Sequence, residues 1–253
     1  MGRWIETLRT ATRPPLWLDD TTYASRLFAG DAPPWLDAAA LAGWRRKALL
    51  LLNPDVAVLD VRGLARAWPD KGTTLLNDRG FIAHLTDVTR VLRASTDKPF
   101  ALDLPAPATW LKMAQGSLTG EGNLDEDEID AVAGDMARLL RAQSEAGIDA
   151  VLLREEVLDP EQLASRIGCY TSLTNTAHHY RWDIGIHTPG GVPITLGSFD
   201  FAIACRGATG VELGIEFWNG ADAPAIDGDG FYFATIPANA QPAQVLARVN
   251  SLS

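Results

Sequence analysis

Short apolar runs alternate with amphipathic stretches along most of the chain. Four of these runs, at residues 16–18, 56–59, 100–102 and 150–153, each end in charged residues. Strands that are buried on both faces of a parallel sheet appear as continuous apolar runs, not as alternating patterns. We therefore predict four strands of a parallel sheet here, each followed by a helical connection.

The stretches between these runs have helical periodicity. Apolar residues from Phe81 to Leu92 recur on one helical face, and Asn77 or Asp78 precedes them as a candidate N-cap. A second helix is predicted over residues 126–146. The acidic residues 125–128 lie at its positive end, and Gly147 follows in the position of a C-terminal cap.

The C-terminal half has a weaker pattern. We expect a helix over residues 173–182, strands over residues 193–196, 211–217 and 231–236, and a closing helix over residues 243–249. These give seven strands, and residues 184–187 could supply an eighth. The predicted fold class is α/β: a single domain over residues 1–253 that forms a (β/α)8 TIM-type barrel, complete or shortened in its C-terminal half.

Composition limits the partners and the compartment. The net charge of −10 repels phosphate groups, so nucleic acid and anionic membranes are poor partners. Two cysteines, Cys169 and Cys205, are too few for a disulfide framework and fit the cytoplasm. No apolar run has the length of a signal peptide or a membrane span. We expect a cytoplasmic protein with a small-molecule substrate, either monomeric or a homodimer.

Several segments resemble the uroporphyrinogen decarboxylase superfamily. Residues 15–18 are similar to its opening strand, residues 55–60 to its second strand and residues 98–103 to its third. The best local match is residues 143–151 (QSEAGIDAV), and residues 231–237 resemble the last βα unit. This resemblance implies a (β/α) barrel. The superfamily contains porphyrinogen decarboxylases, corrinoid- or thiol-linked methyltransferases and the catalytic domain of cobalamin-independent methionine synthase.

Two motifs of that superfamily differ in this chain. The decarboxylases have an arginine-rich segment after the first strand, where this chain has DDTTY at residues 19–23 and then Arg26. The methyltransferases have a His-x-Cys zinc pair, but no cysteine lies two residues after His178, His179 or His187. We therefore expect no metal and no cofactor.

The active site of a (β/α) barrel lies at the carboxyl ends of its strands. Carboxylates that share such a site raise one another's pKa, which suits acid–base chemistry, and arginines there can bind an anionic substrate. Each of these charges could equally cap a helix or form a structural ion pair. The predicted catalytic residues are Asp60, Asp103, Glu155 and His187. The predicted substrate-binding residues are Asp19, Arg62, Arg154, Glu216 and Trp218.

Other polar and aromatic residues have weaker functional signals. His187 precedes a Pro-Gly-Gly loop and could donate a proton or a hydrogen bond, whereas adjacent His178 and His179 point different ways on a helix. Trp17 and Trp110 are expected in the core, and the tryptophans at positions 35, 44 and 68 are expected to line a pocket or an interface.

Three functions remain open from the sequence. The leading hypothesis is a cofactor-free lyase of decarboxylase type that acts on a small or medium carboxylated molecule. In it, Asp60 stabilises a developing cation or carries a proton, and Arg62 or Arg154 holds a carboxylate. The alternatives are a methyltransferase of the same superfamily and a catalytically silent barrel that binds a ligand or a partner protein.

Overall fold

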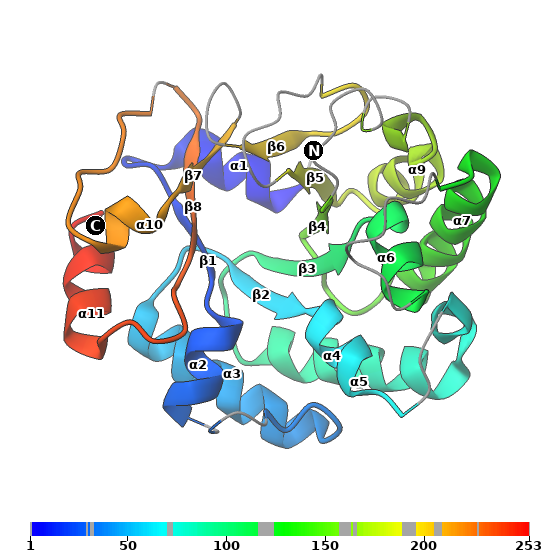
Figure 1. Cartoon of the computed structure of the whole chain (residues 1–253), viewed down its shortest axis with the longest axis horizontal. Helices are drawn as coiled ribbons and strands as arrows, with labels where there is room; N and C mark the ends of the chain where they lie inside the picture. The colour runs from blue at the N-terminus through cyan, green and yellow to red at the C-terminus, as the bar shows by residue number, and fades with distance from the viewer. Residues whose placement is uncertain are drawn as a thin grey trace.

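Eight parallel strands form one sheet that curls into a nearly closed (β/α)8 barrel of the TIM type (Figure 1). The strands lie in the order β1-β8-β7-β6-β5-β4-β3-β2, so β1 and β2 border the gap. Both the predicted fold class and the eighth strand are confirmed. The strands are β1 (Leu16–Asp19), β2 (Ala57–Asp60), β3 (Phe100–Pro105), β4 (Ala150–Arg154), β5 (Asp183–His187), β6 (Phe201–Ala204), β7 (Gly210–Leu213) and β8 (Phe231–Thr235).

This computed structural model describes residues 2–28, 30, 33–69, 73–115, 124–156, 163, 166–188, 196–204, 209–226 and 228–252. Helices alternate with the strands and surround the barrel (Figure 1). They are α1 (Arg3–Thr10), α2 (Thr21–Phe28), α3 (Ala38–Leu52), α4 (Val61–Ala67), the 3-10 helix η1 (Thr73–Asn77), α5 (Arg79–Ala94), α6 (Pro107–Ala114), α7 (Glu126–Ala142), α9 (Thr171–His179), α10 (Ile215–Trp218) and α11 (Pro242–Asn250).

Large aromatic side chains fill the inside of the barrel. Trp4 of α1 lies within 5.4 Å of Trp17 and within 5.1 Å of Phe231, measured between ring centroids, so α1 closes the end where the strands begin. The Asp183 carboxylate anchors this helix by accepting hydrogen bonds from the backbone N–H groups of Gly2 and Ile5, at 2.6 and 2.9 Å.

Two glycines make room for these rings. A Cβ atom on Gly185 would lie 2.1 Å from the Phe201 ring, and one on Gly210 would lie 2.5 Å from the Phe231 ring. Both distances are far below van der Waals contact, so strands β5 and β7 need glycine there.

Hydrogen bonds across the gap hold the beginnings of β1 and β2 together. Leu16 N–H donates to the Asp55 carboxylate at 2.7 Å, and Asp55 N–H donates to the Leu16 carbonyl at 2.9 Å. Arg13 also forms an ion pair with Asp55, at 3.1 Å. The barrel is therefore joined at this end of the gap, although β1 and β2 have no ladder between them.

Several predicted boundaries are confirmed and others are wrong. Asp78 caps α5, as expected, by accepting from the Phe81 N–H at 2.6 Å. The predicted strand at 211–217 ends at Leu213, because the backbone turns at Gly214 into α10. The helix predicted to reach residue 146 ends at Ala142, before a turn. Strand β6 was not predicted as a strand. Residues 193–195 of a predicted strand lie outside the described residues, and residue 196 is not in a strand.

In the described part of the chain, no helix combines the length and the apolar character needed to cross a membrane.

Candidate active site

The side chains of each strand alternate between the barrel interior and the surrounding helices. Residues such as Trp17, Val58, Leu152 and Phe233 belong to the interior cluster. The side chain two positions further along the same face of a strand therefore lies at its carboxyl end, which forms the mouth of the barrel. On six strands that position is ionisable: Asp19, Asp60, Asp103, Arg154, His187 and Glu212.

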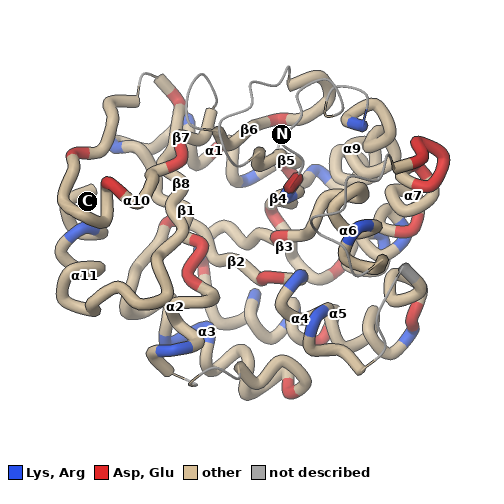
Figure 2. The backbone as a smooth tube through the Cα atoms, viewed as in Figure 1, with Lys and Arg blue, Asp and Glu red and all other residues tan. Residues whose placement is uncertain are grey.

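Arg154 lies at the centre of this charged ring. Its guanidinium donates to both carboxylate oxygens of Asp103, with Nε 2.8 Å from each, and its Nη1 lies 3.1 Å from Asp19. One face of the guanidinium lies 5.1 Å from the centroid of the Phe233 ring. Arg154 and Asp103 are both buried. Figure 2 shows acidic positions near the ends of β2 and β3, in the middle of the molecule.

Burial and mutual repulsion separate the pKa values of the carboxylates. Burial raises the pKa of Asp103 to about 6, although Arg154 opposes the rise. Burial also acts on Asp19, but the positive charges of Arg154 and Arg62 outweigh it and hold the Asp19 pKa below its usual value. Groups with separated pKa values can serve as acid and base in one site. Asp19 is therefore ionised at neutral pH, whereas Asp103 changes its protonation state at about pH 6, close to neutrality.

Asp60 connects the charged ring to a neighbouring cavity. Its carboxylate caps α4 by accepting from the Gly63 N–H at 2.9 Å. Burial raises the Asp60 pKa and nearby Asp19 adds to the rise, although Arg62 opposes it. Asp60 also borders a cavity of about 500 Å³ between α2 and α4, the helices that follow the two strands at the gap. Arg26, Arg66 and Trp35 line the same cavity.

His187 and Glu212 form a second pair at the mouth. His187 is buried, and its Nε2 lies 3.4 Å from a Glu212 carboxylate oxygen, at the long limit of a hydrogen bond. Its ring lies against Phe233, with 4.7 Å between centroids. Burial and the charge of Arg154 lower the His187 pKa, although Glu212 opposes them. A neutral imidazole at neutral pH follows from this balance.

No protein-family profile matches the sequence, and no curated protein matches it. The fold, however, has a known counterpart. The chain is similar in structure to a methyltransferase from Methanosarcina mazei. The TM-score is 0.64, and the likeness covers 99% of this chain and 97% of that chain at 12% sequence identity. At such low identity the likeness shows a shared barrel fold alone, and a fold alone does not define a reaction.

Glu155 is the predicted catalytic residue that the structure places outside the mouth. It follows Arg154 directly, so its side chain has the opposite orientation and lies between the barrel and the helices. There its carboxylate accepts hydrogen bonds from the Tyr170 hydroxyl at 2.5 Å and the Thr109 hydroxyl at 2.9 Å. Glu155 is fully buried there, and its hydrogen bonds hold it in the structure away from the charged ring.

Three further candidates for substrate binding lie in different surroundings. Arg62 follows β2 and forms an ion pair with Glu156 at 2.8 Å, beside the mouth. Glu216 and Trp218 were expected at a strand end, which is wrong because both lie on α10. Glu216 is exposed there, and Trp218 packs in the cluster beneath α11.

The remaining candidates are distributed over core and surface. Trp17, Trp110 and also Trp44 are buried, whereas Trp35 lines the cavity beside Asp60. Exposed His178 lies 3.0 Å from Asp200, on the outer wall. Cys205 and the Pro-Gly-Gly run at 189–191 lie outside the described residues.

The zinc pattern of the methyltransferases does not fit the residues present. Threonine and proline, at positions 188 and 189, follow His187, so the second ligand of a His-x-Cys pair is missing. Within the described ranges, no three His, Cys, Asp or Glu side chains converge in a way that could hold a metal ion. We therefore derive no reaction step that uses a metal.

Sequence reasoning missed Glu212, Arg66 and the cavity. Glu212 could have been found from the sequence, since it lies in the predicted strand over residues 211–217 and two residues after Gly210. Period-two counting from that glycine would have placed it at the mouth. Arg66 has no comparable signal, because its position beside Asp60 depends on how α4 packs against Trp35.

Proposed function

We propose that this chain is an acid–base enzyme that acts on a small carboxylated molecule at the barrel mouth, as a lyase of decarboxylase type. One observation carries the proposal: ionisable side chains occupy inward positions toward the carboxyl ends of six strands, and Asp60 joins this ring to a cavity lined by arginines. Active sites of (β/α) barrels lie at this end, and perturbed pKa values mark catalytic groups.

Asp60 is the proposed proton donor. Burial raises its pKa and so favours the protonated form that a donor needs, and Asp60 borders the space where a substrate would bind. In a decarboxylation, the bond between the carboxyl carbon and its neighbour breaks and CO2 leaves. The electron pair stays on the neighbouring carbon, and the Asp60 proton then binds to that carbon. Water afterwards returns a proton to Asp60.

The proposed carboxylate-binding residues differ from those expected from the sequence. Arg154 already binds Asp103 and Asp19, and Arg62 binds Glu156, so neither guanidinium is available without breaking an ion pair. Arg66 lines the cavity beside Asp60, where its guanidinium can bind a carboxylate bidentately. In this proposal, Arg154 instead holds Asp103 and Asp19 in place.

Methyl transfer is the second candidate function. It is supported by the likeness in structure to a methyltransferase over nearly the whole of both chains. The bond between the methyl group and a methyl-donor substrate would break as the methyl group binds to a nucleophilic acceptor substrate, and Asp60 or the His187–Glu212 pair would accept the proton that the acceptor loses. The two candidates predict different products, and one experiment separates them.

The test is an untargeted search for turnover. Purified protein is incubated with a metabolite extract, and substrates and products are followed by mass spectrometry. Loss of the mass of CO2 from a metabolite supports the lyase, and gain or loss of the mass of CH2 supports methyl transfer. The Asp60→Asn variant should slow the change about 100-fold. Glu145→Gln, at a side chain that is 87% exposed, is the matched control and should preserve it. If the intact protein converts no metabolite and only binds one from the extract unchanged, the chain is a binding protein and the enzymatic proposal is wrong.

A further inference from the structure

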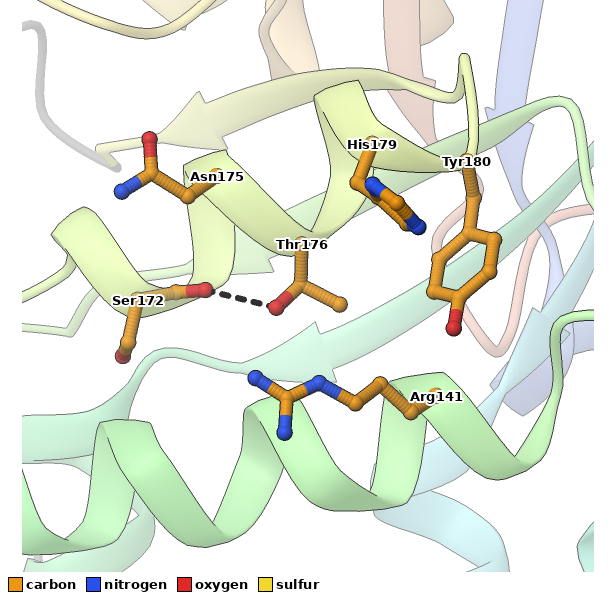
Figure 3. A pocket seen from close by; sticks show the side chains of 6 residues that line it. All are labelled: Arg141, Ser172, Asn175, Thr176, His179 and Tyr180. Atoms are coloured by element: carbon orange, nitrogen blue, oxygen red, sulfur yellow. Dashed lines mark hydrogen bonds between the residues drawn. The ribbon is translucent and has the colours of Figure 1, made fainter.

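A second, polar cavity lies on the outer wall of the barrel, between α7 and α9 (Figure 3). Its volume of about 370 Å³ falls within the range of small-molecule sites. Six residues line it: Arg141, Ser172, Asn175, Thr176, His179 and Tyr180.

The cavity is separate from the mouth. Helix α7 ends at Ala142 and α9 ends at His179, shortly before β4 and β5 begin. Arg141 and His179 therefore lie toward the end of the barrel where strands start, whereas the charged ring lies where strands finish. A molecule in this cavity would not contact the groups proposed for catalysis.

The charge of the lining differs from that of the whole chain. The chain has 32 acidic and 22 basic residues, yet none of the six lining residues is a carboxylate. Two other arginines on this wall have acidic partners: Arg138 lies beside Asp135, and Arg90 lies 3.9 Å from Glu145. The exposed Arg141 side chain forms no ion pair or hydrogen bond with any described residue. The cavity therefore holds a local positive charge in an acidic protein.

Hydrogen-bond donors surround this charge. The Ser172 hydroxyl oxygen is buried and has no partner among the described residues. The Thr176 hydroxyl, by contrast, donates to the Ser172 carbonyl at 2.8 Å, within α9. Figure 3 shows the Arg141 side chain extended along α9 toward Ser172 and Thr176, with the Asn175 amide on the next turn. A buried hydroxyl without a partner is unfavourable, and a bound acceptor would satisfy it.

We propose that this cavity binds the oxyanion group of a small molecule, a phosphate or a carboxylate. Arg141 supplies the charge, and the Ser172 hydroxyl and the Asn175 amide donate hydrogen bonds. Guanidinium groups bind both kinds of oxyanion through parallel hydrogen bonds. Because the cavity lies away from the mouth, its ligand acts as an effector and not as the substrate.

A structural role for the same residues gives a different expectation. Arg141 and His179 lie in the last turns of their helices, where positive charge interacts favourably with the helix dipole. In that case, replacing Arg141 lowers stability equally with and without an anion. A binding role requires that the anion itself stabilise the protein through Arg141.

The test is isothermal titration of the full chain with inorganic phosphate and, separately, with acetate, at constant ionic strength. We expect saturable binding of at least one probe at one site per chain, and the tighter probe identifies the oxyanion. Arg141→Gln should weaken that binding at least tenfold, and Ser172→Ala should weaken it several-fold. Arg79→Gln, at an exposed arginine on α5, is the matched control and should leave binding unchanged.

Three results would overturn the proposal. The first is that neither probe shows saturable binding. The second is that Arg141→Gln lowers the melting temperature but leaves the affinity unchanged, which assigns Arg141 to the helix end. The third is that Arg66→Gln, and not Arg141→Gln, removes binding, which places the anion beside Asp60 at the mouth. This third result would support the carboxylate site of the proposed function, so the two proposals fail separately.

Discussion

Removing the charge of Arg154 should destabilise this protein strongly. Its side chain is 10% exposed and forms ion pairs with Asp103 and Asp19, whose side chains are 8% and 17% exposed. Replacing it with methionine keeps much of the apolar stem but leaves two buried carboxylates without their shared cation. Breaking a buried ion pair in this way costs about 3–5 kcal/mol, and we expect a loss of that size at about pH 7.5.

The size of the loss should depend on pH, and the sign follows from Asp103. Burial raises its folded pKa to about 6, above its ordinary value, so an ionised Asp103 already costs about 3 kcal/mol above pH 6. Without Arg154 that pKa rises further and the cost grows. As the pH falls below 6, Asp103 becomes protonated in the folded parent and in the folded variant alike, so the difference in this cost between them disappears, while the cost itself declines to zero only near the ordinary pKa of 3.8. The loss should therefore be clearly smaller at about pH 5.

Urea denaturation at both pH values measures this directly, as the difference in free energy of unfolding between variant and parent. Arg62→Met is the matched control, because Arg62 and Glu156 have side chains that are 26% and 30% exposed. A pair exposed to this extent is worth under about 1 kcal/mol. The reasoning is refuted if Arg154→Met costs no more than Arg62→Met near neutral pH, or if its cost increases on acidification.

Four further substitutions, the last two compared as a pair, test the site and the packing around it. Asp60→Asn keeps a side chain that can cap α4, so unfolding free energy should change by less than about 1 kcal/mol while turnover falls about 100-fold; a destabilised but active variant would remove Asp60 from catalysis. Glu212→Gln should lower the His187 pKa further in an NMR titration, because the Glu212 carboxylate opposes the lowering by burial and Arg154. An unchanged His187 pKa would show that the two side chains do not interact. Gly63→Ala should cost about 1–3 kcal/mol, since its Cβ would lie 2.5 Å from an indole ring, whereas Gly134→Ala on α7 meets open space and should stabilise by about 0.5–1 kcal/mol. Equal melting temperatures for these two variants would contradict the packing argument.

The first four strands were predictable because they are buried on both faces and end in charge. Apolar runs such as Phe100–Leu102 are typical of a strand that contacts the barrel interior on one side and helices on the other. Strand β6 was not predictable in this way, because its apolar run, Ala202 to Ala204, is short and consists mostly of small side chains. The predicted strand at β7 is too long, because nothing in the sequence of residues 211–217 distinguishes the strand from the short helix after Gly214.

The side of the strand on which a charge lies was harder to predict than its position along the chain. Arg154 ends β4 and Glu155 follows it directly, and the sequence pattern predicts both at the mouth. A run that is apolar on both faces contains no period of two, so it does not show which of two neighbours faces inward.

The orientation is set by partners far away in the sequence. Arg154 meets Asp103 from β3 and Asp19 from β1, while Glu155 meets Tyr170 and Thr109 behind the sheet. A buried carboxylate needs hydrogen-bond donors, and these two hydroxyls supply them on the helix side of β4. If Glu155 had faced inward instead, it would have added a fourth carboxylate beside Asp19, Asp60 and Asp103, with Arg154 displaced from all of them. The charge balance of the mouth therefore depends on the orientation of β4, which only the assembled barrel determines.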